Sequence, residues 1–207
     1  MDGENTRDLK KILRKEIKLR LTAFYENFSE KEKIKLRDSL CKKVTALKEY
    51  QNAALLLAYI PDKLEADCTP LILDALKKGK KVCVPKVDFA ALKEGRSKMD
   101  FYFLDGKKKL EEQLESGAYG IREPKEGLEK LTWSARTSGT VFMIVPGVAF
   151  TKDGKRLGHG KGFYDIYIEE ICKSAAIPFL CGVCLPCQMV EKIPTDAHDV
   201  RMDFVIF

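Results

Sequence analysis

The pattern of apolar and polar positions predicts a long amphipathic helix at the start of the chain. Thr6 is its expected N-cap, and the helix runs to about Phe24. The apolar side keeps a helical spacing and consists of Leu9, Leu13, Ile17, Leu21 and Phe24. The opposite side is basic, because Lys10, Arg14 and Lys18 fall four residues apart on one stripe.

A second helix is predicted directly after the first. Ser29 and Glu32 form a capping-box pattern that marks its start. Its buried side is expected to consist of Leu36, Leu40, Val44 and Leu47. Two helices within residues 6–48 are therefore expected to pack on whatever core follows.

Short apolar runs predict the strands of one sheet. Residues 53–60 are almost continuously apolar, which is typical of a parallel strand covered on both faces. Asp67 as a cap, a helix around 71–76 and a strand over 81–87 complete a β-α-β unit, and the polar, Gly-rich segment 105–139 is expected to be irregular. Further strands are predicted over 99–104, 141–145, 178–185 and 202–207, and a helix over 162–173. The alternation predicts an α/β fold with a mostly parallel sheet flanked by helices on both faces.

Composition fits this picture and narrows the class of protein. A chain of 207 residues that is 45% apolar is suited to a single domain, 1–207. The polar, acidic start resembles no targeting segment, and the longest apolar run is far below the roughly 20 residues that cross a bilayer. We expect a cytoplasmic protein without a membrane segment. Seven cysteines, an odd number, predict reduced thiols and no disulfides.

The charge balance favours small anionic ligands. Lys and Arg number 37 against 31 Asp and Glu, a net charge of +6. This is far below what a dedicated nucleic-acid binder concentrates on one face. Phosphates and carboxylates are therefore the expected ligands.

The most informative segment is the loop 146–162, which follows a predicted strand and leads into a predicted helix. An open α/β sheet binds its ligand at such a place. Gly154, Gly158, Gly160 and Gly162 allow backbone turns with positive φ, and the helix start adds partial positive charge. The loop suits a polyphosphate, with charges neutralised by Lys155, Arg156 and Lys161. The glycine spacing matches neither a Walker motif nor a dinucleotide fingerprint, and a flexible basic turn remains the alternative.

Five segments, in the same order along nearly the whole chain, resemble the 5-formyltetrahydrofolate cyclo-ligase family. They are Lys10-Lys-Ile-Leu-Arg14, Glu65-Ala-Asp-Cys68, Tyr119-Gly-Ile-Arg-Glu-Pro124, Gly154-Lys-Arg-Leu-Gly-His-Gly-Lys-Gly-Phe-Tyr-Asp165 and His198-Asp-Val-Arg-Met-Asp203. His159 stands where an Arg is common in that family, which removes a permanent charge near the phosphates or the folate. Cys68 and Thr151 stand where a Thr and an Asp are usual.

The resemblance implies a set of binding residues. ATP would contact Lys10, Lys11, Ile12, Leu13 and Arg14, and also Arg156, Leu157, Gly158, His159, Gly160, Lys161, Gly162, Phe163 and Tyr164. The folate substrate would contact Arg14, Ile60, Glu65, Tyr119, His159, Gly160, Lys161, Gly162 and Phe163. Asp165 and Asp199 would hold the magnesium ion that accompanies ATP.

Physical reasoning from the residues agrees with part of this assignment. Lys10 and Arg14 offer two cations on one helix stripe, as a triphosphate requires, although a solvated helix face is the simpler interpretation of that stripe alone. Glu65 follows a strand end and can pair with the amide and amine edge of a pterin. Lys161 and Arg156 are the residues expected to stabilise phosphoryl transfer, which needs alignment and charge neutralisation rather than a protein nucleophile.

The resemblance implies a reaction, and other functions stay open. It implies the ATP-dependent, irreversible closure of 5-formyltetrahydrofolate, with or without a polyglutamate tail, to 5,10-methenyltetrahydrofolate by a monomeric enzyme. The alternatives are a non-catalytic protein that binds a nucleotide or RNA through the basic loop, and an enzyme with another phosphoryl acceptor. The C-x-x-C spacing of Cys181 and Cys184 occurs in metal sites, but on an apolar strand the two thiols would point to opposite faces. We interpret both as buried core residues.

Overall fold

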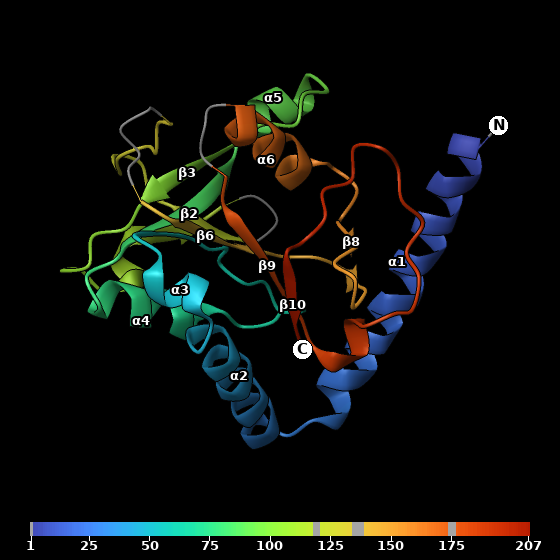
Figure 1. Ribbon diagram of the computed structural model, residues 1–207, viewed down its shortest axis with the longest axis horizontal. Helices are drawn as coiled ribbons and strands as arrows, with labels where there is room; N and C mark the ends of the chain where they lie inside the picture. Colours follow the sequence, from blue (N-terminus) through green and yellow to red (C-terminus); the bar gives the residue numbers. More distant parts are fainter. Residues whose placement is uncertain (1, 118–120, 134–138, 174–176) are drawn as a thin grey trace.

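The computed structural model describes residues 2–117, 121–133, 139–173 and 177–207, and within them a six-stranded sheet lies between two layers of helices (Figure 1). The strand order is β10-β9-β6-β1-β2-β3. All neighbours run parallel except β2 and β3. The sheet strands are β1 (Leu55–Leu57), β2 (Lys81–Val87), β3 (Met99–Phe103), β6 (Val141–Val145), β9 (Phe179–Val183) and β10 (Phe204–Ile206). The helices are α1 (Asp2–Asn27), α2 (Glu30–Thr45), α3 (Lys48–Asn52), α4 (Thr69–Lys77), α5 (Phe89–Lys93) and α6 (Phe163–Lys173).

The central strands carry apolar side chains toward both faces, which is why they read as continuous apolar runs. On one face, Leu56 and Phe142 join a core that also includes residues of α1, α2 and α4. On the other, Leu57 and Met143 join a second core with Ile168 of α6. Burial on both sides confirms the predicted α/β class with a mostly parallel, double-covered sheet.

Several predicted boundaries were wrong. Strand pairing covers only Leu55–Leu57 of the run 53–60. Ala53 and the residues 58–60 are also buried and Ala54 is exposed, because burial follows packing and strand assignment follows pairing. The segment 105–139 is not wholly irregular: it holds a 3-10 helix (Leu110–Gln113) and a hairpin of β4 (Leu114–Ser116) with β5 (Arg122–Pro124). Elements this short, like α3 and α5, span too few residues for a periodic signal.

The first helix also differs from its prediction. It begins at Asp2, so Thr6 lies within it and is not its N-cap. The side that faces the protein includes Lys10, which is only 8% exposed, whereas Leu9 is 46% exposed. Lys10 is buried and Leu9 is exposed because the side of the helix that carries Lys10 faces carboxylates of the C-terminal tail. No helix in the described ranges is long and apolar enough to cross a membrane.

The second helix begins as expected. The Ser29 side chain accepts a hydrogen bond from the Glu32 amide, and the Glu32 carboxylate accepts one from the Ser29 amide. The predicted capping box is thus confirmed. The prediction that Asp67 caps α4 was wrong, because the N-cap is Cys68, one residue later. The Asp67 carboxylate still accepts a hydrogen bond from the Thr69 amide at the start of that helix.

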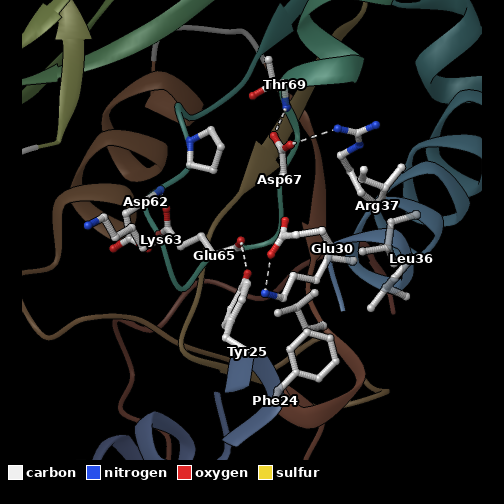
Figure 2. A pocket seen from close by; sticks show the side chains of 15 residues that line it. Phe24, Tyr25, Glu30, Leu36, Arg37, Asp62, Lys63, Glu65, Asp67 and Thr69 are labelled. Carbon is white, nitrogen blue, oxygen red and sulfur yellow. Dashed lines mark hydrogen bonds and ion pairs between the residues drawn. The ribbon is translucent and has the colours of Figure 1, made fainter. Parts of the chain in front are cut away.

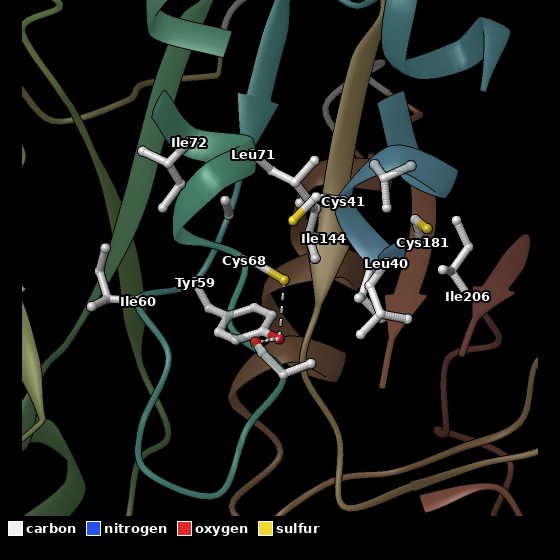
Figure 3. Close-up of a cluster of buried hydrophobic side chains, with 14 of the residues drawn as sticks. Leu40, Cys41, Tyr59, Ile60, Cys68, Leu71, Ile72, Ile144, Cys181 and Ile206 are labelled. Carbon is white, nitrogen blue, oxygen red and sulfur yellow. Dashed lines mark hydrogen bonds between the residues drawn. The ribbon is translucent and has the colours of Figure 1, made fainter. Parts of the chain in front are cut away.

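Five of the seven cysteines are buried and behave as small core residues, whereas Cys172 is exposed and Cys187 is half-buried. Cys41, Cys68 and Cys181 lie in the core between the sheet and helices α2 and α4, where the Cys68 thiol lies 3.3 Å from the Tyr59 hydroxyl (Figure 3). Burial raises the pKa of the Cys181 thiol to about 12, which leaves it protonated and unreactive. Cys184 belongs to the opposite core, so the two thiols of the C-x-x-C spacing point to opposite faces, as predicted.

The fold predicts a strong penalty at Gly182. A Cβ there would lie 2.5 Å from the fully buried Phe150 ring, which also faces Gly147 and has no room to move. We expect Gly182→Ala to cost about 1–3 kcal/mol of unfolding free energy, because overpacking forces the core apart. Gly106→Ala is the matched control, since its Cβ would meet no atom closer than 3.7 Å. Equal thermal midpoints for the two variants would contradict this packing.

Candidate active site

The loop 158–162 lies between the end of the sheet and α6. After β6 the chain forms a short antiparallel hairpin whose strands, β7 (Ala149–Phe150) and β8 (Arg156–Leu157), have two residues each. It then enters the loop. Gly154, Gly160 and Gly162 have φ angles of +88°, +91° and +70°, which favour glycine, as predicted. The prediction was wrong for Gly158, which does not have a positive φ. A Cβ there would lie 3.0 Å from the Arg156 guanidinium, so the backbone passes close to that side chain. The chain therefore bends at Gly154, before β8, and at Gly160 and Gly162 within the loop, and Gly158 makes a close contact.

Arg14 of α1 joins this loop from the far end of the sequence. Its Nε donates a hydrogen bond to the Gly158 carbonyl at 2.8 Å. A Cβ on Gly160 would lie 3.2 Å from the Arg14 guanidinium carbon, so the guanidinium lies directly against the loop. Burial lowers the pKa of Arg14, and the nearby Asp199 carboxylate opposes that shift. The structure brings together two segments that the sequence separates by more than 140 residues.

Lys10 connects the same helix to the C-terminal tail. Its ammonium lies 2.7 Å from an Asp196 oxygen and 2.6 Å from an Asp199 oxygen. Burial alone lowers the pKa of Lys10, but the hydrogen bonds to Asp196 and Asp199 outweigh it and hold the pKa above its ordinary value. Asp196 was missed from the sequence, because nothing in its local pattern distinguishes it from a surface acid.

Arg156 and Asp165 form a second ion pair beneath the loop. The Arg156 side chain is only 4% exposed, and its guanidinium donates to Asp165 at 2.7 Å and to the Pro146 carbonyl at 3.2 Å. The amide of Val200 also donates to Asp165, at 3.2 Å. The guanidinium further lies over the Tyr164 ring, 5.9 Å from its centroid. Arg156 thus faces the interior, whereas Lys161 is exposed on the loop.

Glu65 lies on the other side of the loop. Its carboxylate is 3.5 Å from His159 Nε2 and accepts a hydrogen bond from the Asp62 amide at 3.0 Å. The Glu65 carbonyl accepts a hydrogen bond from the Tyr25 hydroxyl, whose pKa is raised to about 12 by burial and by Asp62. Glu65 therefore links the strand-end segment that begins near Ile60 with both α1 and the glycine loop.

A cavity of about 390 Å³ borders Glu65 on the side of α1 and α2 (Figure 2). Phe24 and Tyr25 from α1 and Leu36 and Arg37 from α2 point into it. Arg14 and the loop 158–162 do not line it. The cavity is therefore a neighbour of the glycine loop, with Glu65 between the two.

The remaining predicted residues are placed unequally. Lys11 and Ile12 face solvent on α1, with Ile12 62% exposed, while Leu13 packs against the core. Leu157 is buried, so only its backbone is available to a ligand. Phe163 and Tyr164, at the start of α6, pack against the core next to that helix. Tyr119 lies outside the described residues.

Asp165 and Asp199 are the two carboxylates that the sequence predicts to hold magnesium, and their chemistry suits that ion. Both offer carboxylate oxygens, which are the ligands that magnesium prefers. The Asp165 carboxylate accepts a hydrogen bond from the amide of Val200, the residue that follows Asp199. Each carboxylate is paired with a cation, Arg156 or Lys10. Across the described ranges, no three His, Cys, Asp or Glu side chains gather as a metal site. Two carboxylates complemented by substrate phosphates are the usual arrangement for this ion.

A mostly parallel sheet with a cation-lined glycine loop before a helix defines an α/β protein of the kind that binds its ligand at such a loop. Comparison with known proteins identifies the family: residues 7–207 match the model of the 5-formyltetrahydrofolate cyclo-ligase family. The chain belongs to this family, and the predicted resemblance is confirmed.

Individual members of this family are similar in sequence to this chain over most of its length. A 5-formyltetrahydrofolate cyclo-ligase of Mus musculus is 30% identical over 199 residues, which cover 96% of this chain and 93% of the mouse protein. A probable 5-formyltetrahydrofolate cyclo-ligase of Schizosaccharomyces pombe is 33% identical and covers 81% of each chain. The solved structure of a 5,10-methenyltetrahydrofolate synthetase from Aquifex aeolicus superimposes with a TM-score of 0.70 at 32% identity, covering 96% of this chain and 89% of that one. This chain is thus an enzyme of the cyclo-ligase type.

The buried ion pair predicts a stability difference between two arginines. Arg156→Met keeps the apolar stem but leaves the Asp165 carboxylate without its cation. We expect a loss of about 3 kcal/mol in unfolding free energy, at the low end for a broken buried pair because Asp165 keeps some access to solvent. Arg201→Met is the control, since its partner Asp153 and Arg201 itself are both more than half exposed, and the expected loss is below about 1 kcal/mol. Denaturant titrations that give equal losses would exclude this role for Arg156.

Proposed function

We propose that this enzyme uses ATP to convert 5-formyltetrahydrofolate irreversibly to 5,10-methenyltetrahydrofolate, releasing ADP and phosphate. The observation that carries the proposal is the meeting of Arg14, the glycine loop and Glu65. Arg14 lies against the loop at Gly158, and His159 of the same loop lies 3.5 Å from Glu65. The proposed triphosphate-binding loop and the carboxylate proposed to pair with the pterin are therefore close together, which supports a reaction between ATP and a folate.

The proposed nucleotide site uses the loop and α1. Backbone amides at the bent glycines and the start of α6 attract the phosphates, and Arg14 and Lys161 neutralise their charge. Lys10, held between Asp196 and Asp199, lies where it can exchange one carboxylate for a phosphate oxygen. Magnesium, bound by Asp165 and Asp199, would neutralise charge on the phosphates.

The proposed folate site lies beside Glu65. Its carboxylate is positioned by the Asp62 amide and can accept the two hydrogens that the amide and amine edge of a pterin presents. Ile60 and Phe163 provide apolar contacts, and the predicted contact through Tyr119 remains a prediction. The exposed His159, at 59% of its side-chain surface, can contact either substrate.

The chemistry requires alignment rather than a protein nucleophile. The formyl oxygen attacks the γ-phosphorus of ATP, and ADP leaves. The formyl group on the nitrogen at position 5 thereby becomes a phosphorylated imine, whose carbon is activated for attack. The nitrogen at position 10 then attacks that carbon and loses its proton, and phosphate departs with the formyl oxygen. Lys161 neutralises the phosphoryl group in transfer, while Arg156 acts from beneath the loop by holding Asp165.

One assay tests the whole proposal. Purified protein mixed with 5-formyltetrahydrofolate and magnesium-ATP should produce the methenyl chromophore together with equal amounts of ADP and phosphate. Leaving out either ATP or magnesium should abolish the signal. Nucleotide binding without a chromophore would instead favour a binding protein or a different phosphoryl acceptor, and would refute the proposed reaction.

Lys161→Ala tests the role of the exposed loop cation. We expect turnover to fall by about 100-fold, the loss typical for removing one charge-stabilising group from a transition state. The thermal midpoint should stay within error, because the side chain is exposed. Lys107→Ala, at another exposed lysine, is the matched control and should keep full turnover. Wild-type turnover in the Lys161 variant would remove this residue from the mechanism.

A further inference from the structure

The glycine loop is held from a side that none of the five family-like segments covers. Ser97, in the connection between α5 and β3, donates its hydroxyl hydrogen to the Lys161 carbonyl at 2.5 Å. We propose that Ser97 is a positioning residue for the nucleotide site, and this inference rests on the proposed function. It acts by fixing the peptide between Lys161 and Gly162.

Ser97 is itself held firmly enough to act as a support. On one side, the Arg96 amide donates to the Ala91 carbonyl at 2.9 Å. On the other, the Lys98 carbonyl accepts from the Asp88 amide at 3.0 Å. Asp88 also caps α5 by accepting a hydrogen bond from the Ala91 amide. Backbone bonds on both flanks therefore place the Ser97 hydroxyl at a defined position beside the loop.

The loop needs such a support at this peptide. Gly160 and Gly162 flank Lys161, and both have positive φ angles. Glycine adopts many backbone conformations at similar energy, so the orientation of the intervening peptide is set by its contacts rather than by its own sterics. On the other side of Lys161 the loop is held at Gly158 by Arg14. Ser97 and Arg14 thus hold two different carbonyls of one flexible loop.

Holding this carbonyl also aims an amide. In a planar trans peptide the C=O and N–H groups point in opposite directions. With the Lys161 oxygen turned toward Ser97, the Gly162 N–H points away from Ser97. Gly162 is also the residue whose carbonyl accepts the first hydrogen bond of α6, from Ile166 at 3.0 Å. The aimed N–H therefore stands at the positive end of a helix, where a phosphate binds.

The test compares Ser97→Ala with Ser97→Thr, which keeps the hydroxyl. We expect the Kd of magnesium-ATP, measured by calorimetry without folate, and the KM for ATP to rise about fivefold in Ser97→Ala, the loss expected for one hydrogen bond. The KM for 5-formyltetrahydrofolate and the thermal midpoint should not change. Ser97→Thr should restore ATP binding, and Ser39→Ala, at an exposed serine on α2, should match the wild type.

Two results would overturn the inference alone. The first is a Ser97→Ala variant whose Kd for magnesium-ATP and KM for ATP equal those of an active wild-type enzyme. The second is a variant in which both KM values rise together with a lower thermal midpoint, which indicates a merely structural role. A wild-type protein that neither binds nor converts ATP would instead refute the proposed function, and this inference with it.

Discussion

The candidate site depends on the contact between the first helix and the second half of the chain. Arg14 donates a hydrogen bond to the Gly158 carbonyl, and Lys10 forms ion pairs with two carboxylates of the C-terminal tail. Without these contacts the glycine loop would lose the Arg14 cation beside it, and Asp196 and Asp199 would lose the cation that they share. The helix that carries both cations is long and reaches beyond the sheet, so it touches the loop and the tail at once (Figure 1).

The two carboxylates proposed to bind magnesium each lie beside a cation of the protein. Arg156 holds Asp165 and Lys10 holds Asp199, so each carboxylate proposed to meet magnesium starts with a cation at hydrogen-bonding distance. Such pairing avoids leaving a half-buried charge without a partner. Removing one partner of a fully buried ion pair lowers the free energy of unfolding by about 3–5 kcal/mol. Under the proposed function, magnesium and a triphosphate would enter by exchanging ionic partners: the metal would replace a cation beside a carboxylate, and a phosphate would replace a carboxylate beside a cation.

Much of the fold could be predicted from local pattern. The buried strands around Leu56, Phe142 and Cys181 follow from continuous apolar runs, and the start of α2 follows from Ser29 and Glu32. The face of α1 could not be predicted, because Lys10 looks like part of a solvated basic stripe until Asp196 and Asp199 are placed against it. Short elements such as α5 were also missed, although α5 anchors the segment that carries Ser97.

The sequence by itself determined that Gly154, Gly160 and Gly162 bend the chain, which strands are buried on both faces and which family the chain resembles, because these depend on residue type and spacing along the chain. Only the tertiary structure decided that Arg156 turns inward to Asp165, that Lys10 pairs with the tail and that Ser97 reaches Lys161. These are contacts between segments 9 to 189 positions apart. Partners at such separations are chosen by how the packed elements meet, and no local pattern records that choice.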